Sequence, residues 1–399
     1  MNTRRIRFFA LLCAASACAL CAEEVTRAIP RTGSHRAFAM GGAFIAFDTG
    51  VNALYGNPAG LAEGGEAEIF IGHHWQVHKT MQYEDDYYND SFGVTEIEYK
   101  PVQKLNYIGI SLVKASADSS FWFGGAVGYG PFYNWRCTRH AASRFIYDAG
   151  EIERTLTEED TYGLFDVIQF GFGLSAGTRG SVGVTINTPF MPRFKTERHY
   201  KWEYISGNFY EINKEHDSNS DKVSTNPFLR VGGMLHVSSR ISVGVLWNQS
   251  HRYEYSEEKR IFPATVNFGV AVTPVRDLLI AVDLESRPWG KVKINDLYLS
   301  DAESGTAWRF GLEYGTRTKI RAGYAWDILP ILDMDDLAVH MQSLSCGLEH
   351  RLGRVRLDLA ARRRFATYQA SEHRWRISED ADDYLIRDWV IQSGIAFVH

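Results

Sequence analysis

Apolar and polar residues alternate along most of the chain with a period of two, the pattern of a β-strand whose two faces meet different surroundings. The pattern recurs in fourteen segments between residues 69 and 397. In one of them, Val266, Phe268 and Val270 alternate with Asn267 and Gly269. The sequence therefore predicts an all-β chain of about fourteen antiparallel strands.

The lengths of the connections indicate where these strands lie. Six short connections alternate with seven long ones without exception. The short ones cover residues 115–120, 178–180, 238–240, 274–277, 316–318 and 352–354, and the long ones cover residues 79–104, 130–167, 188–227, 248–263, 287–306, 327–343 and 362–388. A soluble β-sandwich, which alternation alone also fits, has no reason to order its connections in this way. Short turns at one rim and long loops at the other are typical of outer-membrane barrels, so we predict a transmembrane β-barrel over residues 66–399.

The first 22 residues have the features of a secretory signal peptide. Three arginines lie among the first seven residues, an apolar run follows, and small residues surround a cleavage site near Ala22. Lipoprotein processing at Cys18 is the alternative. Cleavage near Ala22 leaves two cysteines, Cys137 and Cys346, which we expect to be unrelated thiols rather than a disulfide.

Residues 23–65 precede the first strand and contain too many apolar side chains to lie free in water. These side chains are Phe38, Met40, Phe44, Ile45, Phe47, Leu54 and Leu61. A barrel of about fourteen strands has a lumen that is either filled or left as a pore. We therefore predict that residues 23–65 form a helical hatch that plugs the lumen.

Charge and motifs exclude several classes of function. The formal net charge of −5 at pH 7 becomes −8 without the three leader arginines, which argues against a nucleic-acid partner. Nucleophile-elbow, phosphate-loop and zinc-protease motifs are missing from the sequence, so we predict neither an enzyme nor a cofactor. His74 and His78 share a strand face, but two ligands do not make a metal site.

Two parts of the sequence resemble the FadL/TodX long-chain fatty-acid transporter family of outer-membrane proteins. The N-terminal part reads RAFAMGGAF over residues 36–44 and NALYGNPAGL over residues 52–61, and the later part contains PATV at 263–266, Asp283, Trp289, WRFG at 308–311 and RAGY at 321–324. The resemblance covers the expected hatch and roughly residues 261–362. In the middle of the chain, only the pattern of alternating strands is similar.

The resemblance implies passive uptake of hydrophobic, fatty-acid-like molecules across the outer membrane. External loops capture the molecule, an apolar luminal pocket binds it, and it leaves sideways through a gap at a kinked third strand beside the hatch. It assigns the hatch role to Asn57, Pro58 and Ala59, although the same residues also fit a rigid turn.

The adjacent Gly124 and Gly125 interrupt the third predicted strand, which fits either the lateral opening or a site of strand curvature. Phe44 and Leu54 of the hatch belong to the same expected ligand-binding or gating set. The expected surroundings are outer-membrane lipid, after Sec-type export in a diderm bacterium, with a monomer as the default.

Charged residues on the predicted lumen face offer a further candidate site. We expect them to form a structural network, because buried charges need partners. Among them, Arg309 and Arg321 are candidates for binding a ligand carboxylate. The long loops are polar and tyrosine-rich rather than apolar, so an alternative function is a non-transporting barrel that binds other envelope proteins through these loops.

Overall fold

The computed structural model describes most of the chain after residue 33. The described residues are 34–63, 67–87, 91–99, 102–118, 120–134, 137–147, 152–177, 179–206, 209–255, 258–298, 303–332, 338–370 and 382–399. The predicted signal peptide and Cys18 lie outside this set. In the described part, none of the helices has the length and apolar character needed to cross a membrane.

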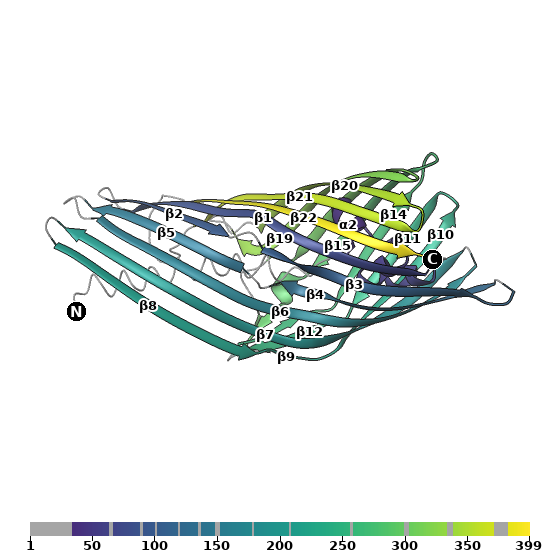
Figure 1. Ribbon diagram of the computed structural model, residues 1–399, viewed down its shortest axis with the longest axis horizontal. Helices are drawn as coiled ribbons and strands as arrows, with labels where there is room; N and C mark the ends of the chain where they lie inside the picture. Colours follow the sequence, from purple (N-terminus) through teal and green to yellow (C-terminus); the bar gives the residue numbers. More distant parts are fainter. Residues whose placement is uncertain are drawn as a thin grey trace.

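Within the described residues, a closed antiparallel β-barrel of 14 strands forms the body of the molecule (Figure 1). Its strands are β1 (Glu68–Tyr87), β3 (Val102–Ala115), β4 (Phe121–Asn134), β6 (Ile152–Ala176), β7 (Gly180–Ser206), β10 (Phe228–Ser238), β11 (Ile241–Asn248), β14 (Thr265–Val272), β15 (Leu278–Arg287), β18 (Gly305–Gly315), β19 (Thr318–Leu332), β20 (Ala338–Leu352), β21 (Val355–Ala370) and β22 (Asp382–Val398). The barrel closes where β1 pairs with β22, from Glu68 opposite Val398 to Gln82 opposite Leu385. The predicted all-β barrel and its strand number are confirmed.

The remaining elements lie in the long connections and in the N-terminal segment. They are α2 (His35–Ala39), α3 (Val51–Tyr55), η1 (Pro58–Ala62), β2 (Ser91–Tyr99), β5 (Cys137–Tyr147), β8 (Phe209–Lys222), β9 (Ser224–Thr225), β12 (His251–Tyr255), β13 (Glu258–Phe262), η2 (Trp289–Lys291), β16 (Lys293–Ile294) and β17 (Leu297–Tyr298). The strands β9, β12, β13, β16 and β17 form a small second sheet.

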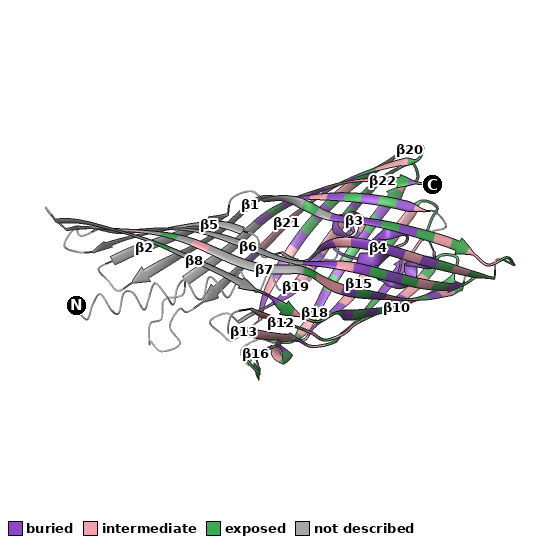
Figure 2. Cartoon of the chain, turned by 60° about the horizontal axis from the view of Figure 1, so that its bottom comes forward, coloured by how far each residue is buried: buried purple, intermediate pink, exposed green. Residues whose placement is uncertain are grey.

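The apolar face of the strands points outwards. Val266, Phe268 and Val270 on β14 are 43–56% exposed, whereas Asn267 between them is buried. The same alternation of exposed and buried residues repeats around the barrel wall (Figure 2). A soluble sandwich would bury the apolar face, so this orientation requires a lipid-like environment around the barrel.

Three of the predicted long loops are largely strand, which corrects the prediction. β1 extends to Tyr87 and β7 to Ser206, and β6 already begins at Ile152. Their backbone pairing continues, with β6 and β7 paired from Ile152 to Ala176. The apolar alternation stops because strands that rise beyond a membrane meet water on both faces, so the sequence signal ends before the strand does.

The N-terminal residues 34–63, called here the luminal segment, lie inside the barrel. α2, α3 and η1 are short, and nearly all of their side chains are buried. Asn57 caps η1 by accepting a hydrogen bond from the Ala59 amide at 3.1 Å, and Pro58 occupies the first helical position, where its missing N–H has no cost.

Candidate functional site

The luminal segment lies against a row of glycines on four neighbouring strands. Gly124 on β4 is paired with Gly173 on β6, which is paired with Gly183 on β7, and Gly183 is paired with Gly232 on β10. A Cβ on Gly124 would lie 2.1 Å from the carbonyl oxygen of Leu61, and on Gly183 it would lie 2.2 Å from that of Pro58. These glycines therefore let the backbone of η1 lie directly on the wall.

The opposite wall accommodates the turn after α2, at residues 40 and 41, in the same way. A Cβ on Gly311 would lie 2.7 Å from the Cβ of Met40, and one on Gly323 would lie 2.0 Å from the Gly41 amide nitrogen. Gly41 itself has a φ of +71°, a left-handed conformation that glycine adopts without strain. The luminal segment is thus enclosed by wall residues on both sides.

Hydrogen bonds from the wall fix two turns of the luminal segment. The Asp283 carboxylate on β15 accepts the Phe44 and Ile45 amides at 2.6 and 2.9 Å. The Asn57 amide donates to the Ile45 carbonyl at 2.6 Å and to the Gly233 carbonyl on β10 at 3.2 Å. Asn57 therefore joins two parts of the segment to each other and to the wall.

An ion-pair network surrounds Arg321 at the lumen face. Arg321 contacts the carboxylates of Glu313, Glu349 and Asp358, and its side chain is 1% exposed. Arg36 of the luminal segment also contacts Glu313 at 2.8 Å. The predicted structural network is therefore present, and Arg321 is enclosed by acidic partners.

Arg309 belongs to a second, smaller network. It contacts Asp327 and, at 3.5 Å, Glu285, and Arg287 contacts the same two carboxylates. Two cations and two carboxylates balance in charge here. The carboxylate-binding role predicted for Arg309 and Arg321 stays a prediction, and the geometry gives both a role in holding the wall.

Asp48 is a buried carboxyl within the luminal segment. Burial raises its pKa to about 6, against the opposing effects of the Arg36 guanidinium and of the Ser34 hydroxyl. The Ser34 hydroxyl donates to one oxygen of Asp48 at 2.9 Å, and the other oxygen has no hydrogen-bond partner among the described residues. The charged form of Asp48 is therefore poorly stabilised where it lies.

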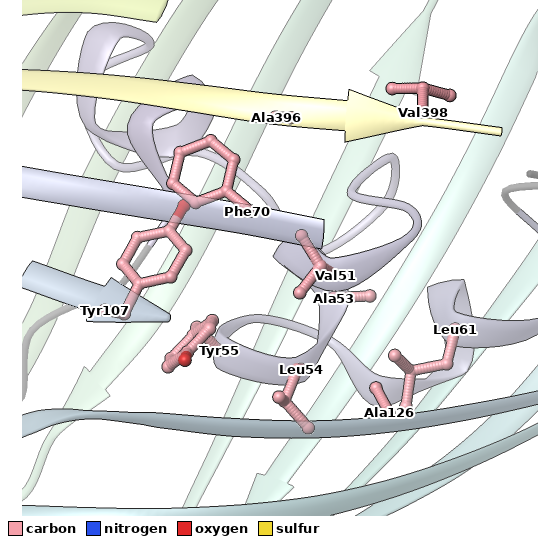
Figure 3. Close-up of a cluster of buried hydrophobic side chains, with 10 residues drawn as sticks. All are labelled: Val51, Ala53, Leu54, Tyr55, Leu61, Phe70, Tyr107, Ala126, Ala396 and Val398. Carbon is pink, nitrogen blue, oxygen red and sulfur yellow. The ribbon is translucent and has the colours of Figure 1, made fainter. Parts of the chain in front are cut away.

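A pocket of about 90 Å³ lies between the luminal segment and the β10–β15 wall. Apolar atoms make up most of its lining surface, although nine of the 18 lining residues are polar or charged. The lining includes Phe44, Tyr55, Phe228, Arg230, Leu246, Phe262, Thr265, Glu285, Arg287, Trp289 and Val292. Phe44 lines it as part of the expected ligand-binding set. Leu54 does not, because it packs into a separate apolar cluster with Val51, Phe70 and Tyr107 (Figure 3).

The wall is unpaired at one place beside the luminal segment. The pairing of β3 with β4 runs from Ala115 opposite Trp122 to Ile108 opposite Tyr129 and ends there. Both strands continue, but β3 then pairs only with β1, and residues 130–134 of β4 pair only with β6. Among the described residues, β3 and β4 therefore separate beyond Ile108 and Tyr129. We call this place the wall gap; β2 and β5 lie farther along the molecule, towards the left of Figure 1.

Gly124 and Gly125 do not interrupt β4, contrary to the prediction. Both are paired without a register shift to β3 and to β6. Gly124 faces the luminal segment, and a Cβ on Gly125 would meet no atom within 4 Å. Gly124 therefore fits close contact with the luminal segment, and neither glycine breaks the ladder.

Pro131 is the signal that the sequence interpretation missed. It lies on β4 just beyond Tyr129, and the register with β6 shifts between Pro131 and Tyr133. β3 has a matching shift opposite Gly72 and His73 of β1. A proline has no N–H for the ladder and occurs in strands at edges or bulges, and bulges bend strands, so the two strands part at this level.

The described part of the chain contains no candidate metal site, because no three of its His, Cys, Asp or Glu side chains lie around a common point. Cys346 is a free thiol on the exposed face of β20. Cys137 begins β5, and its side chain lies outside the described residues.

Comparisons with known proteins identify similar folds. No family model matches the sequence, and no curated protein matches it either. Among solved structures, a Pseudomonas aeruginosa FadL homologue has a TM-score of 0.53 at 12% identity and covers 91% of this chain and 98% of its own. The P. putida toluene transporter TodX has a TM-score of 0.56 at 12% identity with the same coverages.

A second structure of P. putida TodX has a TM-score of 0.52 at 13% identity, covering 90% of this chain and 97% of its own. At these identities the likeness concerns the fold. It spans nearly the whole of both chains. This includes the middle of this chain, where the sequence resembles the family only in its pattern of strands. The chain therefore has the fold of the FadL/TodX-like outer-membrane proteins, as the resemblance in its sequence indicates.

Proposed function

We propose that the protein is an outer-membrane channel for the passive uptake of hydrophobic small molecules, with residues 23–65 as its hatch. The observation that carries the proposal is an apolar pocket on the luminal segment, in a barrel whose wall is unpaired beside that segment. A scaffold barrel would have its lumen filled with side chains at this level. The names of the similar structures, a FadL homologue and a toluene transporter, agree with this assignment.

The route we propose begins at the external strands, passes the pocket and leaves through the wall gap into the membrane. The luminal segment blocks the direct route along the barrel axis, because it is buried against the glycines on both sides. Asn57, Pro58 and Ala59 hold this segment on β7 and β10 rather than at the gap itself. Uptake needs no energy source, since apolar solutes move from water to lipid spontaneously.

Filling the pocket tests the proposal. Thr265 lines the pocket, so Thr265→Trp should block it and lower the uptake of an apolar compound by about tenfold, the effect of a loss of about 1.4 kcal/mol in binding. The measurement is accumulation of toluene and of a long-chain fatty acid by cells, determined by mass spectrometry.

The matched control is Thr306→Trp. Thr306 lies on the exposed face of β18, so the same residue change adds bulk outside the lumen and should leave uptake unchanged. Equal uptake by the wild type, Thr265→Trp and a strain without the protein would contradict the proposed function. Mass spectrometry of compounds co-purified with the wild type would name the cargo.

The length of the external strands favours one second candidate, a barrel that binds other envelope proteins. β6 has 25 residues and β7 has 27, although a membrane-spanning strand needs only about 9–11. Much of both strands therefore lies beyond the membrane as a surface for a partner. Crosslinking in cells separates the candidates: a protein partner captured by the external strands, together with normal uptake by Thr265→Trp cells, would favour this one.

A further inference from the structure

Tyr55 of the luminal segment touches both the pocket and the wall gap. Its hydroxyl lies 3.0 Å from the Ile108 carbonyl oxygen and 3.1 Å from that of Tyr129. Ile108 and Tyr129 are the last pair of the β3–β4 ladder. A single hydroxyl from the luminal segment therefore bridges the two strands at the point where they separate.

Two glycines make room for this contact. Gly109 on β3 is paired with Gly128 on β4. A Cβ on Gly128 would lie 2.5 Å from the Tyr55 hydroxyl oxygen, and one on Gly109 would lie 3.7 Å from it. The wall is thus free of side chains where the hydroxyl enters.

The other end of Tyr55 belongs to the pocket. Tyr55 lines the pocket, and its main-chain carbonyl accepts a hydrogen bond at 2.7 Å from Arg230, which lines the pocket too. Its ring lies 4.3 Å from the ring of Tyr107, centre to centre. A molecule that enters the pocket therefore contacts both Tyr55 and the guanidinium that positions it.

We propose that Tyr55 is a latch on the wall gap: its hydroxyl holds β3 and β4 together at their last pair, and occupancy of the pocket releases it. The proposal rests on the proposed function for the pocket and the gap as one route. Tyr55 acts here as a positioning residue. When the hydroxyl leaves the two carbonyls, the last pair frays and the gap extends towards the periplasmic end.

Tyr55→Phe tests the latch, because it keeps the ring, its contact with Tyr107 and the size of the pocket, and removes only the hydroxyl. The first measurement is hydrogen–deuterium exchange of the purified barrel without ligand. We expect amide exchange in residues 102–110 and 127–134 to rise about fivefold, the effect of losing one ordinary hydrogen bond. Exchange elsewhere and the thermal unfolding temperature should stay unchanged.

Tyr107→Phe is the matched control. The Tyr107 hydroxyl donates to Asn52 at 3.1 Å and does not reach the two carbonyls of the gap, so its removal should leave exchange at β3 and β4 as in the wild type. Wild-type exchange at both strands in Tyr55→Phe would overturn the latch. A general rise in exchange over the whole barrel would overturn it too, because that indicates a purely structural role.

The second measurement tests the release by a bound molecule, with the apolar fluorescent probe N-phenyl-1-naphthylamine. Saturating probe should raise exchange at residues 127–134 in the wild type and cause no further rise in Tyr55→Phe. Bound probe without any change in the wild type would overturn the release step. If neither protein binds any of the apolar compounds tested, the proposed function fails, and the ligand-free exchange still decides whether Tyr55 closes the gap.

Discussion

At the scale of single residues, the luminal segment combines groups that hold it in place with one group that opposes its docking. Asp283 accepts two backbone amides of the segment at 2.6 and 2.9 Å. Asn57 donates to the Ile45 carbonyl of the segment at 2.6 Å and to the Gly233 carbonyl of the wall at 3.2 Å. Asp48 differs, because among the described residues its buried carboxylate accepts only the Ser34 hydroxyl, at 2.9 Å, and no backbone amide. Its charge is therefore a cost of the docked state.

The raised pKa of Asp48 predicts a pH dependence of docking. The pKa is about 6 when the segment is docked and 3.8 for an ordinary aspartate. Below pH 4 both states are protonated and Asp48 has no effect. As the pH rises from 4 to 6, the released segment ionises more readily than the docked one, so docking weakens and the full penalty is present above pH 6.

Asp48→Asn should remove this penalty and stabilise docking at pH 7 by up to about 3 kcal/mol, because asparagine carries no charge and can still accept from Ser34. Hydrogen exchange of residues 34–63 at pH 5 and pH 7, corrected for the intrinsic rate, measures the change. Asp277→Asn in the exposed turn after β14 is the control and should have no effect. Faster exchange in Asp48→Asn at pH 7 would show that the charge stabilises docking instead.

At the scale of elements, β4 contains two adjacent glycines with opposite surroundings. Gly124 faces the carbonyl oxygen of Leu61, a backbone atom that cannot rotate away, and Gly125 faces open space. Substitutions at the two positions therefore distinguish the effect of contact with the luminal segment from the general effect of replacing a glycine in a strand.

Gly124→Val should displace η1 from the wall and destabilise docking by about 1–3 kcal/mol, the usual cost of overpacking, whereas Gly125→Val should be neutral. Limited proteolysis of the folded barrel at residues 57–63 reports the displacement. If both variants resist cleavage equally, the contact between η1 and β4 contributes nothing to docking. If both are cleaved, the effect belongs to the strand rather than to the contact.

At the scale of the whole molecule, the barrel and the luminal segment depend on each other. Among the described residues, many glycines of the wall leave space that the luminal segment fills, and a barrel of 14 strands without this segment has an open interior. The hatch that we propose for the luminal segment predicts how the pore behaves without the segment.

Deletion of residues 34–63 should therefore give large, stable ion conductance in planar lipid bilayers, while the intact protein should conduct very little. The control is a variant that keeps the segment and carries Thr306→Trp on the outer face, which should stay closed. Equal conductance of the intact and deleted proteins would mean that the luminal segment does not block the lumen.

Much of the fold can be predicted from the sequence, because the membrane imposes a pattern on residues that are close together in the chain. Lipid on one face and a crowded lumen on the other make each strand alternate with a period of two, and Val266–Val270 shows this alternation in sequence and in structure. This alternation is lost above the membrane, where both faces of a strand meet water. For this reason β8 and the outer half of β7 were predicted to be loops.

Less of the candidate site could be predicted from the sequence. The charged lumen residues and the apolar residues of the luminal segment were identified, because charged residues on a strand face and apolar residues before the first strand both need buried surroundings. The pocket was not, because Phe228, Leu246 and Phe262 come from separate strands and meet only after the barrel closes. Gly124 and Gly125 were interpreted as either the lateral opening or a site of strand curvature, whereas the wall gap lies beside Pro131.

The strand number, the order of short and long connections and the apolar N-terminal segment can be read from the sequence alone, because each depends on residues close together in the chain. The folded barrel is needed to show which glycines receive the luminal segment, where β3 and β4 part, and that Tyr55 reaches that point. The hydrogen bonds of Tyr55 and Arg36 with the wall join residues 53 to 277 positions apart, and alternation with a period of two does not specify them.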